Sequence, residues 1–262
     1  MLTKKVYLTI DDAPSKDFRE KVDYLYERNI PAIFFCIGEN IIKYEEDVIY
    51  AIRKGFIIGN HSFNHKYFSN MTLVECKDSI KKTDDIIEEL YIKSNIDRPM
   101  KLFRFPHFDQ GGDLNSEAYE GKWSKPKCEW SVYEKNDKRL SIQEFLSELG
   151  YIQPKFEGIN IKFFSDKTLM EGIDIRCTFD QMEYFLDVKD APYGMYKEES
   201  ILHRIDEDVP YEGRSLNCYE TADIILIHDQ EKTTRLFYEI IDRYLEKKFE
   251  FLKLTTIEII GK

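Results

Sequence analysis

Two histidines, His61 and His65, stand four residues apart, a spacing that lets one turn of chain bind a single cation. An aspartate pair, Asp11 and Asp12, follows an apolar run near the N-terminus. Successive strand residues point to opposite sides, so one aspartate can ligate a metal while the other acts as a base. The competing interpretation is that the pair only begins a turn before Pro14. Two histidines and a carboxylate with open positions would suit zinc, cobalt or another divalent ion.

Two further residues could complete a hydrolytic site. Arg104 stands near the end of another apolar run, where it can hold a carboxylate, with Asp11 the natural partner, or form a plain structural ion pair. His228 ends the run at 223–227, and a histidine titrating near neutral pH can protonate a leaving group. Asp229 can cap the next helix or orient that imidazole.

Short apolar runs alternate with amphipathic stretches along the chain, which predicts a parallel sheet closed or nearly closed by helices. A capping box at Thr72 and a second at Ser141 mark helix starts, Gly150 marks a helix end, and Ser15 can cap the first helix. The predicted strands are 6–10, 30–37, 56–58, 101–105, 173–179, 223–227 and 249–254, and the predicted helices follow Ser15 and span 39–54, 72–91, 141–150, 197–206 and 232–247.

The candidate residues mostly follow directly on predicted strands. In parallel α/β barrels the carboxyl ends of the strands form the active face, so these side chains are expected to converge. No repeat or linker divides the chain, and residues 1–262 are interpreted as one domain with an irregular insertion at about 107–140. That insertion could form a substrate-facing wall or a surface excursion with its own small cluster.

Composition narrows the class of protein. The 262 residues are 42% hydrophobic and carry a net charge of −11, which fits a globular chain and argues against a nucleic-acid partner. The five cysteines form no C-x-x-C pair, so free and mostly buried thiols are expected, which fits a reducing compartment.

No apolar stretch reaches the length of a membrane span. No apolar segment typical of a signal peptide precedes the first strand. The sequence as it stands therefore predicts a cytoplasmic location, or the cell envelope if a leader was removed. Oligomeric state is left open.

Five motifs in order resemble those of the polysaccharide deacetylase family, also called the NodB-homology domain or carbohydrate esterase family 4. The family patterns are T-F-D-D-G-P, H-[ST]-x-x-H, R-x-P-Y, D-x-x-D-W and L-x-H. The chain has TIDDAP at 9–14, HSFNH at 61–65, RFPH at 104–107, DQMEY at 180–184 and LIH at 226–228. The resemblance spans about residues 5–254, and its fourth motif is the weakest match.

The resemblance implies a distorted (β/α) barrel of α/β class and a role for each matching residue. It implies Asp11 as general base, His228 as general acid and Arg104 as the residue that orients Asp11. A motif-four carboxylate, Glu183 or Asp180, would tune His228. The implied metal ligands are Asp12, His61 and His65, and the implied substrate and oxyanion residues are Pro106, His107, Tyr184 and Asp180.

Three departures from the family pattern are visible. Ala13 replaces a glycine, His107 replaces a tyrosine, and Glu183-Tyr184 replaces Asp-Trp. The family uses the backbone N–H at the position of His107, so that role survives the substitution.

The predicted function is metal-dependent removal of N-acetyl groups from amino sugars of a poly- or oligosaccharide or glycan precursor. One alternative is hydrolysis of another C–N amide bond, in a small molecule. The other is a catalytically inactive glycan-binding relative.

Overall fold

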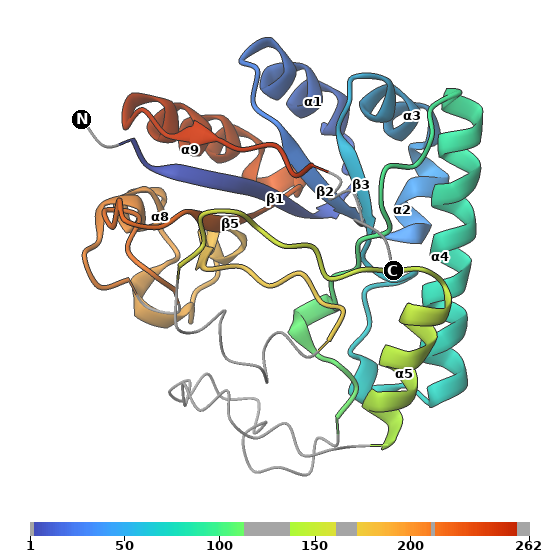
Figure 1. Cartoon of the computed structure of the whole chain (residues 1–262). Coiled ribbons are helices and arrows are strands. Elements are labelled where there is room, and N and C mark those ends of the chain that lie inside the picture. Colours follow the sequence, from blue (N-terminus) through green and yellow to red (C-terminus); the bar gives the residue numbers. More distant parts are fainter. Residues whose placement is uncertain (1–2, 113–136, 161–171, 211–212, 256–262) are drawn as a thin grey trace.

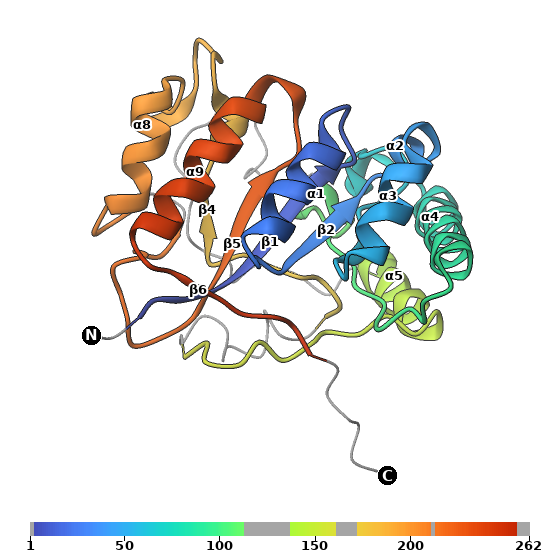
Figure 2. The ribbon, with the colours of Figure 1, turned by 90° about the horizontal axis from the view of Figure 1, so that it is seen from above.

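The computed structural model describes residues 3–112, 137–160, 172–210 and 213–255. A parallel sheet runs through the molecule, with helices packed along its outer side (Figures 1 and 2). The strands are β1 (Lys5–Ala13), β2 (Ala32–Cys36), β3 (Ile57–Asn60), β4 (Phe179–Asp180), β5 (Asp223–His228) and β6 (Glu250–Phe251). The helices are α1 (Phe18–Glu27), α2 (Gly38–Lys43), α3 (Glu45–Arg53), α4 (Leu73–Ser94), α5 (Asp137–Glu148), α8 (Glu198–His203) and α9 (Thr234–Glu246).

The strand order β3-β2-β1-β5-β4 places β1 at the centre of the sheet, and β6 pairs with its N-terminal end. All the pairings are parallel. In the β1–β5 register, Asp11 lies opposite His228. The first and last motifs are therefore neighbours at the carboxyl edge of the sheet, as the strand prediction required.

Two irregular segments, 101–105 and 173–178, close the sheet into a ring. Asn60 donates its N–H to the Leu102 carbonyl at 2.9 Å, and Ile175 donates to the Phe103 carbonyl at 2.9 Å. Thr178 then donates to the Ile224 carbonyl of β5 at 2.8 Å. Single hydrogen bonds in place of continuous ladders make the barrel distorted, and the predicted fold class is confirmed.

The predicted strands at 101–105 and 173–179 are wrong as regular strands, because only β4 (Phe179–Asp180) forms there. Side chains form hydrogen bonds with the backbone N–H and C=O groups that would otherwise pair with a neighbouring strand. Asp174 Oδ1 accepts the Phe105 N–H at 3.2 Å, and Arg104 Nε donates to the Ile175 carbonyl at 2.6 Å.

Both faces of the sheet are buried, which explains the continuous apolar runs of the sequence. Alternate residues of β1 divide between two clusters, as a two-residue period requires. Leu8 packs outward against the helices, whereas Tyr7 packs in the barrel interior, where its ring meets that of Phe156 edge-on at 4.9 Å. The outer cluster includes Ile240 of α9, and together the clusters fix the central strands that carry the candidate residues.

The helix predictions succeed at some ends and fail at others. The Thr72 capping box and the Gly150 C-terminal position, with φ of +82°, are confirmed. The Ser141 box is wrong, since α5 begins at Asp137 and Ser141 lies inside it. Ser15 does not cap α1, because its hydroxyl donates to Asp229. The predicted helix 39–54 is two helices that meet at Tyr44.

Other boundaries move by a few residues. The predicted helices 197–206 and 232–247 correspond to α8 and α9, each joined to a short 3-10 turn, and the predicted strand 249–254 shrinks to β6. Most of the predicted insertion lies outside the described residues.

Four of the cysteines lie in the described part of the chain, and all four are free. Cys36 and Cys76 are buried, whereas Cys177 and Cys218 are half-buried. No helix in the described ranges is long and apolar enough to cross a membrane.

Candidate active site

The loop after β3 presents both histidines of the second motif. Asn60 accepts the Ser62 N–H at 2.8 Å, and Ser62 Oγ accepts the His65 N–H at 3.2 Å. Ser62 and His65 have φ of +64° and +53°, left-handed conformations that these side-chain bonds hold in place. The tight loop turns both imidazoles toward the end of β1.

One imidazole is fixed in the tautomer that a metal ligand needs. His61 Nδ1 lies 2.8 Å from the Arg104 carbonyl oxygen. A carbonyl only accepts, so Nδ1 carries a proton, and in the neutral ring the lone pair is on Nε2. Nε2 of His61 lies 3.8 Å from Asp12 Oδ1 and 3.6 Å from Asp11 Oδ2.

Asp12, His61 and His65 form a cluster whose candidate ligand atoms lie within 4.8 Å of one another. His65 Nε2 is 3.1 Å from Asp12 Oδ1. That oxygen is buried and receives no hydrogen bond within the described structure. A buried carboxylate oxygen facing two imidazole nitrogens fits a divalent transition ion.

The protonation states of the cluster also fit a cation. Burial would raise the pKa of Asp12, but His228, His65 and His61 together lower it to about 2. Burial and the neighbouring His61 lower the pKa of His65 to about 4, although Asp12 opposes them. At neutral pH the site therefore offers an ionised carboxylate and a neutral imidazole, the forms that bind metals.

The second aspartate of the pair has different partners. Arg104 is fully buried, and its Nη1 donates to Asp11 Oδ1 at 2.6 Å and to Thr9 Oγ1 at 3.0 Å. The contact with Asp11 runs through one guanidinium nitrogen, since Nε is bonded to the Ile175 carbonyl. Asp11 is thus fixed beside the Asp12–His61–His65 cluster, and Asp12 turns into that cluster with φ of +63°.

His228 ends β5, on the side of β1 that faces away from β2 and β3, and it contacts the fourth motif. Glu183 Oε1 accepts the His228 backbone N–H and lies 3.1 Å from His228 Nδ1. Burial alone would lower the pKa of His228, but Glu183, with Asp12 and Asp180, raises it to about 10. His228 is therefore protonated at neutral pH.

Of the two carboxylates that the fourth motif offers, Glu183 contacts His228. Asp180 instead accepts the Met182 N–H at 2.9 Å and the Tyr184 hydroxyl at 3.4 Å. Burial raises the pKa of Asp180, with Glu183 adding to the rise and His228 opposing it. The Tyr184 ring meets the His228 ring edge-on at 4.8 Å.

The third motif reaches the cluster through His107. This residue follows Pro106 in a short 3-10 turn and has φ of +56°. Its ring stacks on Tyr67 at 3.8 Å and meets the His65 ring edge-on at 4.4 Å. The oxyanion role of the His107 N–H stays a prediction.

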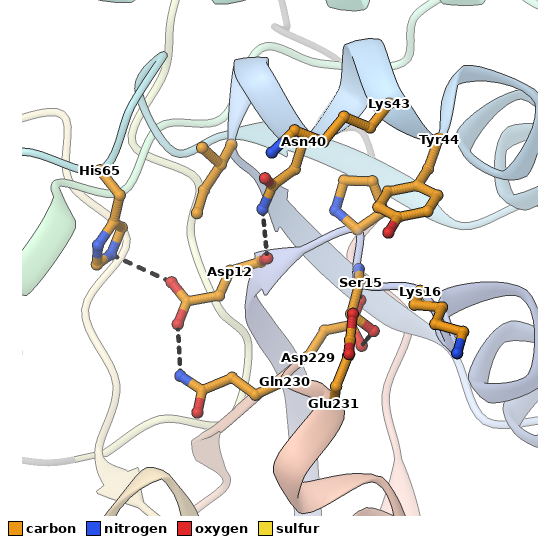
Figure 3. A pocket seen from close by; sticks show the side chains of 12 residues that line it. Asp12, Ser15, Lys16, Asn40, Lys43, Tyr44, His65, Asp229, Gln230 and Glu231 are labelled. Carbon is orange, nitrogen blue, oxygen red and sulfur yellow. Dashed lines mark hydrogen bonds and ion pairs between the residues drawn. The ribbon is translucent and has the colours of Figure 1, made fainter.

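Two contributions were missed in the sequence. Gln230 Nε2 donates to Asp12 Oδ2 at 2.9 Å. Gln230, Asp12 and His65 line one cavity of about 330 Å³, and Figure 3 shows the three side chains there.

Asp229 neither caps a helix nor orients His228, because its carboxylate binds Ser15 and Lys21. In the sequence, only the position of Asp229 and Gln230 directly after His228 could have indicated that they contribute to the site.

Comparison with known proteins agrees with this picture. The polysaccharide deacetylase family model matches residues 1–120. The peptidoglycan-N-acetylglucosamine deacetylase of Bacillus cereus is 36% identical over 87 residues, which are 33% of this chain and 32% of that protein. The chain thus matches about a third of that relative's length.

Solved structures resemble the chain over nearly all of its length. The catalytic domain of a peptidoglycan N-acetylglucosamine deacetylase from Eubacterium rectale has a TM-score of 0.59 at 17% identity, covering 97% of this chain and 90% of that one. A CE4 family pseudoenzyme from Bacillus anthracis has a TM-score of 0.56 at 16% identity, covering 95% and 63%. At these identities the structures show a shared fold.

The chain has the parallel α/β fold of these deacetylase structures. Its predicted resemblance to the polysaccharide deacetylase family is confirmed by the family model over residues 1–120, and the shared fold extends over most of the chain. The relatives named here are bacterial.

Proposed function

We propose that this protein is a metal-dependent hydrolase that removes acetyl groups from N-acetylated amino sugars of a glycan. One observation carries the proposal. Asp12, His61 and His65 form a cluster that could hold a cation, beside a carboxylate held by Arg104 and a histidine held by Glu183. A protein that only binds glycans would need neither the cation cluster nor the proton-transfer pair of Asp11 and His228.

A divalent ion bound at the cluster would lower the pKa of a water molecule and polarise the acetyl carbonyl. Asp12, His61 and His65 are the residues that would hold it. Zinc is the first candidate, because the donor set of two imidazoles and one carboxylate is typical of catalytic zinc sites.

The remaining side chains would move protons. Asp11, oriented by Arg104 at 2.6 Å, takes the proton of the attacking water. His228 enters the reaction protonated, because Glu183 lies 3.1 Å from Nδ1. It donates from Nε2 to the departing amine. The His107 N–H is proposed to donate to the developing oxyanion.

The test is an acetate-release assay on chito-oligosaccharides and peptidoglycan fragments, with zinc or cobalt added to metal-stripped protein. The proposal expects acetate release that needs the metal and is lost in His228→Gln. Activity that survives both chelation and Asp12→Ala would refute the metal mechanism.

Two other outcomes distinguish the alternatives. Turnover of small-molecule amides with no turnover of any amino sugar would identify a different amide hydrolase. Glycan binding without turnover, in protein saturated with zinc, would identify an inactive relative. The intact set of cluster ligands and proton-transfer residues favours the enzyme.

A further inference from the structure

The two oxygens of the Asp12 carboxylate have different surroundings. Oδ2 accepts a hydrogen bond from Gln230 Nε2 at 2.9 Å, whereas Oδ1 faces His65 Nε2 at 3.1 Å. Figure 3 shows both contacts as dashed lines on opposite sides of the carboxylate. Because a carboxylate only accepts, Gln230 must present its NH₂ group to Oδ2, and that group has no lone pair for a metal.

The loop that carries Gln230 is anchored by buried polar contacts. Asp229 donates its N–H to the Asp11 carbonyl at 2.8 Å, and its Oδ2 accepts the Ser15 N–H at 2.7 Å. Lys21, fully buried in α1, donates to Asp229 Oδ1 at 2.5 Å and to the Gln230 carbonyl at 3.3 Å. These bonds tie the residues after β5 to those after β1, so the backbone of Gln230 is fixed relative to Asp12.

We propose that Gln230 is a positioning residue for the metal site, one that holds Asp12 Oδ2 and leaves Oδ1 as the single carboxylate ligand. Without the Gln230 amide, the Asp12 carboxylate can rotate about its Cβ–Cγ bond. Metal binding must then restrict that rotation, which weakens the affinity. Hydrogen bonds to ligating carboxylates typically change metal affinity 10- to 100-fold. This inference rests on the proposed metal site.

The experiment measures zinc affinity in the full chain by competition with a chromophoric chelator. Gln230→Met keeps the length of the side chain and removes the donor, and Gln230→Ala removes both. Each is expected to weaken zinc binding about 10- to 100-fold. Because Gln230 is only half-buried, the melting temperature of the metal-free variants is expected to match the wild type. Glu231→Gln is the matched control, since Glu231 lines the same cavity and is exposed.

The cobalt-loaded proteins give a second readout. The visible absorption of Co²⁺ reports its coordination, and its spectrum is expected to change in both Gln230 variants and to stay unchanged in Glu231→Gln. Unchanged zinc affinity in Gln230→Met, or a loss in only one of the two variants, overturns the inference while leaving the proposed function intact. Wild-type protein that binds no zinc overturns the metal site and this inference together.

Discussion

Replacing Glu183 with glutamine removes one charge next to His228 and keeps the shape of the side chain. Glu183 is 1% exposed, and its Oε1 lies 3.1 Å from His228 Nδ1. A glutamine carbonyl can still accept the His228 backbone N–H that Glu183 accepts now. The substitution therefore tests the charge of Glu183 more than its packing.

The expected size of the effect follows from the distance between the two groups. Two unit charges about 3 Å apart attract by about 5 kcal/mol at an effective dielectric constant of about 20. Since about 1.4 kcal/mol changes a pKa by one, the variant should have a His228 pKa that is lower by about three to four. The pKa, about 10 in the wild type, would then lie between about 6 and 7.

The direct assay is an NMR titration of the His228 ring in metal-free protein, assigned by comparison with His228→Gln. In the wild type the ring should stay protonated from pH 7 to 9, whereas in the variant it should lose its proton as the pH rises through about 6 to 7. Acetate release by the zinc-loaded variant should then be lower at pH 9 than at pH 6 by about a hundredfold or more. The wild type should show no such fall.

The reasoning fails if Glu183→Gln leaves the titration of His228 unchanged. It also fails if the variant loses activity equally at pH 6 and pH 9. An equal loss would mean that Glu183 only holds the loop in place, and that its charge does not keep the general acid protonated.

Three further predictions address the other parts of the site. Asp11→Asn should lower acetate release by about 10²- to 10⁴-fold while zinc affinity stays within tenfold of the wild type, and a parallel loss of zinc would assign Asp11 to the metal. Lys21→Met should lower the free energy of unfolding by about 3–5 kcal/mol, measured by urea denaturation, because it leaves the Asp229 carboxylate buried without its cation. A loss below about 1 kcal/mol would contradict this. Zinc at about 100 times its dissociation constant should add about 2.7 kcal/mol to the free energy of unfolding of the wild type and nothing to that of Asp12→Ala.

The sequence was sufficient to predict the central strands and their convergence. Buried strands such as β1 and β5 have unmistakable apolar runs, and parallel pairing brings their carboxyl ends to one edge. Asp11 and His228 could therefore be expected near each other, and the register places them opposite. Asp12, His61 and His65 likewise lie together as expected.

The irregular parts could not be predicted, because side chains there replace backbone ladders. Segments 101–105 and 173–178 look like strands in the sequence, yet Arg104 and Asp174 take up the groups that would pair. The choice between Glu183 and Asp180 likewise depends on the backbone after β4, where Met182 has φ of +61°. A left-handed turn of that kind leaves no trace in hydrophobic periodicity.

The pairing of β1 with β5 links the two halves of the site. Asp12 is a candidate metal ligand and His228 is the proposed general acid, and both lie at the ends of strands held in one register. A shift of one residue in that register would reverse which side of the sheet His228 faces. Beyond the strand ends, Asp229 bonds to the Asp11 carbonyl and Gln230 to the Asp12 carboxylate. The spacing between Asp12 and His228 is therefore set by backbone bonds between two central strands, whereas His61 and Glu183, which complete the two halves of the site, come from other segments.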